Sequence, residues 1–371
     1  MAVYKIFPEK DATLYSEYVD MNTGRDEILE IASYYKGILK YVNRSVIAFD
    51  SVEVANVLES YVSSSNRAAT DFSASLKLML ASANELPTRY TLEAYPVYAG
   101  ASTWEVGNGK YGDVPRNSSG VAWNRTNAAG GAWSVTANVT ASYSGSIGGG
   151  AWYTGSATYD FSTMTQSHAV NSTHDTDINV TEGVKAHYAG DIVNSGFIVK
   201  LEDDLEFQTD RQLYLRYFGT DTHTIYPPCL EIKWDDFTND STLTEVSDPN
   251  IVVKIKNNRG EYADVGKQRF NMHVRPQYPA RTFATSSIYL TNHYLPTASY
   301  WGIKDENTEE MVIDFDTTFT KISRNSTGNY FDIFMEGLEP ERHYRVLVKS
   351  EIDGSTNVID EDLVFKVVRN G

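Results

Sequence analysis

The amino-acid sequence predicts an all-β protein, and three observations lead to this fold class. Short segments in which apolar and polar residues alternate recur along the 371-residue chain, as expected for strands that bury one face. Gly- and Ser-rich joints separate these segments, and only two stretches have the apolar spacing of a helix. This pattern favours β-sandwiches and jelly rolls, and the chain length favours two or three domains.

In the first part of the chain, the alternation predicts several strands. The most regular one is Leu-Glu-Ile-Lys-Trp at residues 230–234, and a turn signal, Asn-Ser-Gly, introduces another at residues 197–201. The predicted strands of this part cover residues 75–80, 90–95, 134–143, 197–201 and 230–234.

The two helix signals lie in the same part of the chain. Apolar residues at positions i, i+3, i+4 and i+7 from Val54 predict a helix over residues 51–61. A shorter helix of one or two turns is predicted over residues 181–188. Both are minor elements in a chain that otherwise consists of strands and turns.

A change in composition marks the domain boundary. Residues 235–241 are polar and turn-prone, and an alternating strand follows at residues 251–255. Five of the six tryptophans precede this stretch. We therefore predict a first domain at residues 1–236, a linker at residues 237–247 and a second domain at residues 248–371.

The second domain contains a recognisable strand corner. Gly-Leu-Glu-Pro at residues 337–340 is followed by Tyr344 in a Tyr-x-Val-x-Val strand. This sequence motif resembles the strand corner of immunoglobulin-like and fibronectin-III-like sandwiches, in which a tyrosine hydroxyl forms a hydrogen bond with the preceding backbone. The resemblance implies an Ig/fibronectin-III-like β-sandwich and a structural role for Tyr344. Such domains typically serve as spacers, adaptors and docking surfaces.

The overall charge excludes several classes of partner. The net charge is −17 and the pI is about 4.8, which argues against nucleic acid and against an anionic membrane surface. No apolar run reaches the length of a membrane span. The single cysteine, Cys229, allows no intrachain disulfide, and residues 1–10 lack the apolar core of a signal peptide. We therefore expect assembly in a reducing compartment.

Candidate chemical groups do not form a persuasive catalytic set. Cys229 precedes a strand and is interpreted as a small buried side chain. A Ser- and Gly-rich stretch at residues 143–148 lacks the strand and helix that a nucleophilic serine elbow needs. We therefore predict a protein that is not an enzyme, with no catalytic residue and no cofactor.

Metal ligands were considered at two places. His168, His174, Asp175 and Asp177 lie close together in the sequence, and residues 202–204 are Glu-Asp-Asp. Neither stretch has the ordered spacing of a zinc or calcium motif, so solvated acidic turns are the favoured interpretation. The sequence therefore predicts no dedicated metal site.

Four tryptophans of the first domain suggest a recognition surface or a core. They lie in Gly-rich, polar surroundings: Trp104, Trp123, Trp133 and Trp152. Exposed tryptophan faces stack on sugar rings, whereas buried ones fill a sandwich core or a protein interface. The second interpretation is favoured, and the first remains as the alternative. The 25 tyrosines also suit interfaces.

A series of short motifs resembles the DNRLRE-type β-sandwich, a jelly-roll family related to carbohydrate-binding modules. Examples are Asn-Thr-Gly at residues 22–24, Arg-Ser-Val-Ile-Ala-Phe-Asp at residues 44–50 and Asn-Ser-Gly-Phe at residues 194–197. The others, in the same order as in the family, lie at residues 11–15, 74–78, 103–105, 120–123, 177–181 and 227–232. The resemblance covers most of residues 3–236 and implies a jelly-roll fold in which a structural calcium ion is possible. Long Gly- and Ser-rich insertions between residues 107 and 175 depart from the family.

The whole chain resembles in style the tail-associated virion proteins of T4-like and marine tailed bacteriophages. The Trp-rich first half, a strand-like segment at residues 286–293 and the fibronectin-like end carry this resemblance. It implies a non-enzymatic structural protein of the tail, baseplate or neck. Its partners would be other virion proteins in a symmetric multi-copy assembly, formed in the host bacterial cytoplasm. The alternative is a carbohydrate-binding module, or a receptor-binding or decoration protein, that recognises host glycans.

Overall fold

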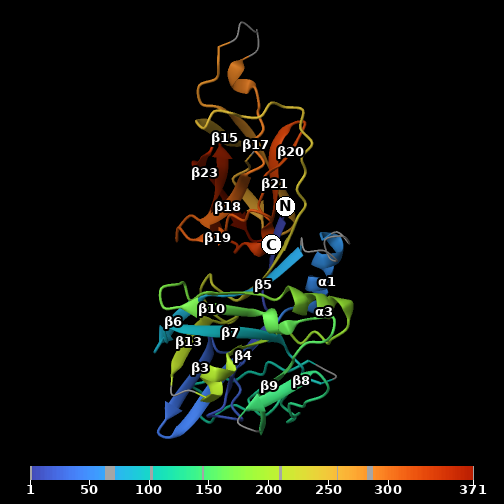
Figure 1. The fold of residues 1–371 in the computed structure, drawn as a ribbon, viewed down its shortest axis with the longest axis vertical. Coiled ribbons are helices and arrows are strands. Elements are labelled where there is room, and N and C mark those ends of the chain that lie inside the picture. The colour runs from blue at the N-terminus through green and yellow to red at the C-terminus, as the bar shows by residue number, and fades with distance from the viewer. Residues whose placement is uncertain are drawn as a thin grey trace. The chain divides into compact units, whose positions relative to one another are not determined.

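The computed structural model describes residues 2–62, 72–100, 103–143, 146–208, 211–256, 258–281 and 287–370. Antiparallel β-strands dominate these residues, so the predicted all-β, sandwich-like fold class is confirmed (Figure 1). Helices α1 (Ser51–Ser60) and α3 (Thr181–Ala189) cover the two stretches for which the sequence predicts helices.

Contacts divide the chain into two compact units. The N-terminal unit contains residues 6–62 and 73–231, and the C-terminal unit contains residues 232–370. Residues 2–5 and Phe72 belong to the C-terminal unit, although they are far from it in sequence. The N-terminal unit is therefore inserted, in sequence terms, within the C-terminal unit.

A large antiparallel sheet forms the frame of the N-terminal unit. Its order is β10-β7-β12-β4-β3-β13-β6, and β2 also pairs with β4. The strands are β2 (Lys10–Tyr15), β3 (Ile28–Lys36), β4 (Leu39–Ala48), β6 (Leu80–Asn84), β7 (Arg89–Pro96), β10 (Thr165–Ala169), β12 (Phe197–Leu201) and β13 (Leu213–Phe218). Strand β12 has the predicted bounds because its apolar run follows the predicted turn.

Smaller β elements complete this unit. Strands β5 (Phe72–Leu78), β11 (Thr176–Asn179) and β14 (Cys229–Trp234) lie in a second sheet, whose order together with β1 (Ala2–Ile6) is β1-β14-β5-β11. Strands β8 (Val139–Tyr143) and β9 (Ser146–Tyr153) form a hairpin. The strand predicted over residues 134–143 begins only at Val139, because Asn138 has φ of 61° and the Val139 amide bonds to the Thr136 carbonyl in a turn.

The chain changes sheets between β5 and β6. The sequence predicts one strand over residues 75–80, but β5 ends at Leu78 and β6 begins at Leu80 in the other sheet. The carbonyl of Met79, between them, accepts the amide of Phe218 at 3.1 Å. The pairing of β6 with β13 shifts register between Arg216 and Tyr217, as at a β-bulge. Strand β6 thereby becomes the last strand of the large sheet.

The helices are fixed by local capping and packing. The Asp50 side chain accepts the Val52 amide at 2.8 Å and begins α1, which buries Val54, Val57 and Leu58. Helix α3 ends at Gly190, whose φ is 76°.

The C-terminal unit is a β-sandwich of two sheets. One has the order β15-β17-β21-β20 and the other β16-β23-β22-β18-β19. The strands are β15 (Ile251–Lys256), β16 (Glu261–Ala263), β17 (Lys267–Pro276), β18 (Ser299–Asp305), β19 (Met311–Ile313), β20 (Ser323–Asn325), β21 (Gly328–Phe334), β22 (Arg342–Ile352) and β23 (Ser355–Val368).

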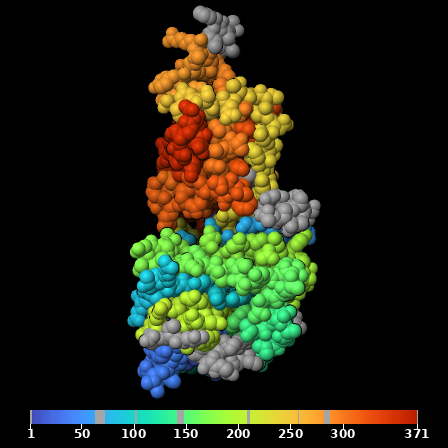
Figure 2. Space-filling view, viewed as in Figure 1, coloured from blue at the N-terminus to red at the C-terminus, as the bar shows by residue number. Residues whose placement is uncertain are grey.

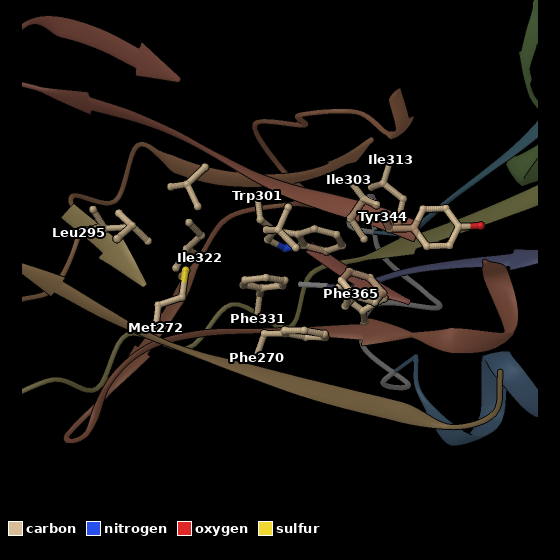
Figure 3. Close-up of a cluster of buried hydrophobic side chains, with 14 of the residues drawn as sticks. Phe270, Met272, Leu295, Trp301, Ile303, Ile313, Ile322, Phe331, Tyr344 and Phe365 are labelled. Carbon is tan, nitrogen blue, oxygen red and sulfur yellow. The ribbon is translucent and has the colours of Figure 1, made fainter. Parts of the chain in front are cut away.

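An aromatic stack fills the core between these sheets (Figure 3). The ring of Phe331 lies between those of Trp301 and Phe270, with centroid distances of 5.1 Å and 5.5 Å. Phe365 and Tyr344 extend the stack from the second sheet. Aromatic rings of both sheets therefore interdigitate in one core.

The first strand of the chain contributes to the same core. Strand β1 (Ala2–Ile6) places Val3, which is 3% exposed, in the hydrophobic cluster of the C-terminal unit. The Tyr4 ring lies 5.4 Å from that of Phe334. These contacts explain why residues 2–5 group with the C-terminal unit rather than with the first predicted domain.

Residues of the predicted linker also pack within the C-terminal unit. The carbonyl of Thr238 accepts the Arg324 amide at 2.9 Å, and the Asp240 amide bonds to the Arg324 carbonyl at 3.1 Å. Val246 is 2% exposed and belongs to the core. These residues therefore extend the sheet beside β20 instead of forming a free tether.

The strand-like segment at residues 286–293 is not a strand. Residue 286 lies outside the described residues, and Ile288–Leu290 form a single 3-10 turn. The Leu290 amide bonds to the Ser287 carbonyl at 3.0 Å, and the side chains of Tyr289 and Leu290 are exposed. The prediction is wrong because the apolar residues here face solvent and have no strand partner among the described residues.

Candidate functional site

The four candidate tryptophans lie together in one hydrophobic cluster of the N-terminal unit. Their exposed fractions are between 1% and 6%. The indole nitrogen of Trp104 donates to the Ser195 carbonyl at 2.9 Å, and that of Trp133 donates to the Ala122 carbonyl at 3.0 Å. The rings therefore contact the protein itself, and a sugar-stacking role has no open ring face here.

A buried ion pair lies among these rings. The Arg44 guanidinium is 5.3 Å from the Trp123 ring and 5.0 Å from the Trp152 ring. It pairs with Glu206 at 2.6 Å, and both side chains are fully buried. Gly149 has φ of 74° and lies so close to the Trp123 ring that a Cβ there would meet it at 2.6 Å. The cluster is thus a closed packing arrangement around one paired charge.

Tyr344 forms the contact that the strand corner predicts. Its side chain is 2% exposed, and its hydroxyl donates to the Glu339 carbonyl at 2.9 Å. Burial raises the pKa of Tyr344, and the negative charge of Glu339 acts in the same direction. The phenol therefore stays neutral and holds the turn before β22.

The candidate metal ligands are engaged elsewhere. His174 Nδ1 lies 2.8 Å from the Tyr90 hydroxyl, and the His168 ring stacks on the Tyr90 ring at 4.9 Å. Asp175 accepts the Leu80 amide, and Asp177 pairs with Lys77 at 3.7 Å. These residues share a region of the N-terminal unit but do not converge on a common point.

The acidic stretch 202–204 is likewise bound to the protein. Asp203 pairs with Lys200 at 2.9 Å, and the Glu202 carbonyl accepts the Leu205 and Glu206 amides. Across the described ranges, no group of three or more His, Cys, Asp or Glu side chains is arranged to hold a metal ion. Cys229 is buried at the start of β14.

A feature that the sequence analysis missed lies at the end of the large sheet. A shallow depression of about 480 Å³ is lined by Asn84, Glu85, Tyr214 and Arg216. Strands β6 and β13 bring these residues together, since Asn84 pairs with Tyr214 across the two strands. The cyan-blue region that includes β6 reaches the surface of the N-terminal unit (Figure 2).

Further tyrosine rings pack behind Tyr214, the aromatic residue that lines this depression. The Tyr34 ring stacks on Tyr214 at 4.9 Å and contacts Tyr41 at 5.7 Å. The Tyr34 hydroxyl donates to Glu17 at 2.9 Å. The stack fixes the Tyr214 ring, so the aromatic wall of the depression is rigid.

The charges around the depression are partly paired. Arg216 Nε donates to Glu30 at 2.9 Å, and the Glu30 bond raises the pKa of Arg216. Burial, with the charges of Glu30 and Glu85, raises the pKa of Tyr214 to about 12. Glu85 is exposed and has no ion pair within 4.0 Å among the described residues. At neutral pH the depression therefore presents a neutral phenol, a guanidinium, an amide and a free-standing carboxylate.

These groups suit recognition rather than bond-making chemistry. The walls offer an aromatic face together with hydrogen-bond donors and acceptors, but no nucleophile lies beside a base in the depression. The sequence gives a weak signal for this site, because β6 and β13 are about 130 positions apart along the chain. Only the polar-apolar alternation of residues 213–217 marks the Tyr214 and Arg216 side chains as one face.

Comparisons with known proteins give no assignment. No protein-family model matches the chain, and no curated protein sequence matches it significantly. No helix in the described part of the chain is long and apolar enough to cross a membrane.

Proposed function

We propose that the chain is a non-enzymatic structural protein of a tailed-bacteriophage virion, associated with the tail, baseplate or neck. It acts through contacts with other virion proteins. The observation that supports this proposal is the depression beside β6, in which Tyr214 and Arg216 lie on two paired strands of a rigid sheet. Tyrosine and arginine are the residues that protein interfaces favour, and rigid aromatic anchors carry much of their binding energy.

The location in a virion is tested by mass spectrometry of purified particles of the phage that encodes the chain. We expect the chain in a fixed copy number relative to the tail proteins, as a symmetric assembly requires. Purified particles that lack it would overturn the proposal.

The role of the depression is tested by a double variant. Tyr214→Ala with Arg216→Ala removes the aromatic wall and the guanidinium, so we expect the variant to fold but to enter particles at a reduced level. The matched control is Tyr278→Ala with Arg281→Ala, which changes the same residue types at exposed positions of the C-terminal unit. Equal incorporation of both variants would exclude the depression as the interface.

Glycan recognition is the second candidate, and the same depression favours it. An aromatic ring beside an amide, a carboxylate and a guanidinium is a set of groups that contacts sugar hydroxyls and ring faces. Binding of the isolated protein to a host-surface glycan array, abolished by Tyr214→Ala, would move the proposal from a structural to a receptor-binding role.

A further inference from the structure

Strand β6 ends the large sheet with one edge that no strand covers among the described residues. It pairs with β13 on its inner side, and no strand follows it in the sheet order. Ala81, Ser82 and Asn84 are exposed. Its sequence, Leu-Ala-Ser-Ala-Asn, contains no charge and no proline. Edge strands without charges, proline or a covering segment are ready templates for another strand.

Four other sheet edges of the described residues, β15, β16, β20 and β10, are protected. Strand β15 carries Lys254 and Lys256, and β16 carries Glu261 and is only three residues long. Strand β20 pairs with residues 238–240. Strand β10 is joined to β11 through a side chain, because Gln166 Oε1 accepts the Asp177 amide at 2.6 Å. Strand β6 is unlike these edges in having neither a charge nor a cover.

Two carboxylates bracket the open part of the β6 edge. At the start of β6, the Leu80 amide donates a hydrogen bond to Asp175 Oδ1 at 2.7 Å. This amide is therefore already bonded, and the Asp175 carboxylate lies at the edge of β6. At its end, Glu85 is exposed and lines the depression with Asn84. The six residues from Leu80 to Glu85 span at most about 17 Å, and Glu85, whose φ is 55°, directly follows the extended residues of β6.

We propose that β6 binds an extended segment of a basic partner protein, which adds to the sheet as a further antiparallel or parallel strand. The backbone of residues 81–84 supplies the hydrogen bonds, and basic side chains about five positions apart meet Asp175 and Glu85. The neighbouring depression receives a side chain of the segment beside Tyr214. This inference rests on the proposed function, since it names the chemistry of the partner at the same site.

Charge argues against a second copy of the chain as the occupant. An antiparallel pair of identical β6 edges would place Glu85 of one copy near the Leu80 end, and hence the Asp175 carboxylate, of the other. Each copy also carries a net charge of −17. Like charges at these positions oppose the pairing, whereas lysine or arginine side chains favour it.

The experiment uses a synthetic probe, a fluorescent peptide with the sequence Arg-Thr-Val-Thr-Val-Arg, titrated against the full chain at about 0.15 M salt, where long-range charge attraction is screened. We expect it to bind about tenfold tighter than the Glu-Thr-Val-Thr-Val-Glu peptide. Two further probes are versions of the basic peptide with N-methyl groups on alternate residues. One is methylated at the odd-numbered positions of the peptide and the other at the even-numbered positions. Strand addition predicts that one of these loses binding and the other keeps it, because only alternate amides face the edge.

Two protein variants separate the site from general attraction to an acidic protein. Glu85→Arg should weaken binding of the basic peptide about tenfold, whereas Glu59→Arg, the same charge change at an exposed position of α1, should leave it nearly unchanged. Equal losses for both variants, or equal binding of both N-methylated probes, would overturn the proposal. So would a stable dimer in light scattering that the peptide dissociates.

The virion role and strand addition at β6 can fail independently of each other. If the chain is present in purified particles but does not bind the basic peptide, the proposed structural function stands and the proposed strand addition is excluded. Specific binding of the probe by a chain absent from particles would keep the edge site and remove the virion role.

Discussion

The two units hold buried carboxylates in opposite ways. In the N-terminal unit, Asp11 is 2% exposed, and the Thr220 amide and hydroxyl donate to it at 2.7 Å and 2.9 Å. In the C-terminal unit, Asp305 is 1% exposed, but its partner is the Arg342 guanidinium at 2.6 Å.

Burial raises the pKa of Asp11 to about 6 despite its hydrogen bonds. For Asp305 burial acts in the same direction, but the bond and charge of Arg342 and the amides of Thr308 and Asn307 together outweigh it and lower the pKa to about 2. A buried carboxylate held by a guanidinium and two amides therefore keeps a lowered pKa, whereas one held by the amide and hydroxyl of a threonine does not.

Removing the guanidinium is the largest expected perturbation of this comparison. Arg342→Met leaves Asp305 buried with only the Asn307 and Thr308 amides as donors, so we expect the C-terminal unit to lose about 3 kcal/mol of unfolding free energy. Urea denaturation measures the loss, and hydrogen exchange in β18 and β22 assigns it to this unit. The double variant with Asp305→Asn should recover part of it. An Arg342→Met protein as stable as the parent would mean that the amides alone hold the charge.

The N-terminal unit should lose stability as the pH rises from about 4 to about 6. The folded-state pKa of Asp11, about 6, lies above the ordinary value of 3.8, so the folded state binds more protons in this window. Its unfolding free energy therefore falls, by about 2–3 kcal/mol for a shift of this size. Asp11→Asn should flatten the profile in β2 and β4, as monitored by hydrogen exchange across the window. An unchanged slope would show that another group carries the dependence, and Asp26, whose pKa burial also raises to about 6, is the next residue to replace.

The C-terminal unit should respond to acid with the opposite sign. The folded-state pKa of Asp305, about 2, lies below 3.8, so its contribution is present above about pH 4 and is lost as the pH falls toward 2. The expected loss is about 2 kcal/mol. Measurement of both units between pH 2 and pH 7 should therefore give two profiles that slope in opposite directions. Parallel profiles would contradict the contrast between the two carboxylates.

The smallest expected effect concerns the strand corner. Tyr344→Phe keeps the buried ring but removes the hydroxyl that bonds to the Glu339 carbonyl, so we expect a loss of about 1 kcal/mol from the C-terminal unit. Phe365→Leu serves as a packing control, because it changes the same core without touching a hydrogen bond. If Tyr344→Phe costs nothing while the control destabilises the unit, the corner is held by packing alone.

Local features of the fold could be predicted from the sequence. Strand β12 and helix α1 follow their apolar periodicity, and Tyr344 makes the contact that its corner motif predicts. Each of these depends on residues within a few positions of one another. Short-range periodicity and turn chemistry were sufficient to find them.

Features that depend on distant residues could not be predicted in this way. The depression joins Asn84 and Tyr214, which only strand pairing brings together. The Gly-rich surroundings of Trp123 left an exposed ring open as the alternative to a buried one, and they did not show that Gly149 lets the ring pack closely against the backbone. Residues 2–5 gave no signal that their partners are Phe334 and the other core residues of the C-terminal unit.

The position of β1 has a consequence for synthesis of the chain on the ribosome. Val3 is made before every other residue of the cluster that buries it, and this cluster is not finished until Val367 is made. The N-terminal unit, residues 6–62 and 73–231, is therefore complete before the core partners of Val3 are made, although β14, the strand that pairs with β1, is already present. Closing the contact between Val3 and this core joins segments separated by more than 220 residues. A ribosome-stalled chain that ends before β15 should fold its first unit and hold β1 only by its pairing with β14, so protease should cut residues 2–5 faster than in the 371-residue chain. Full protection of these residues should appear only when the last strands emerge.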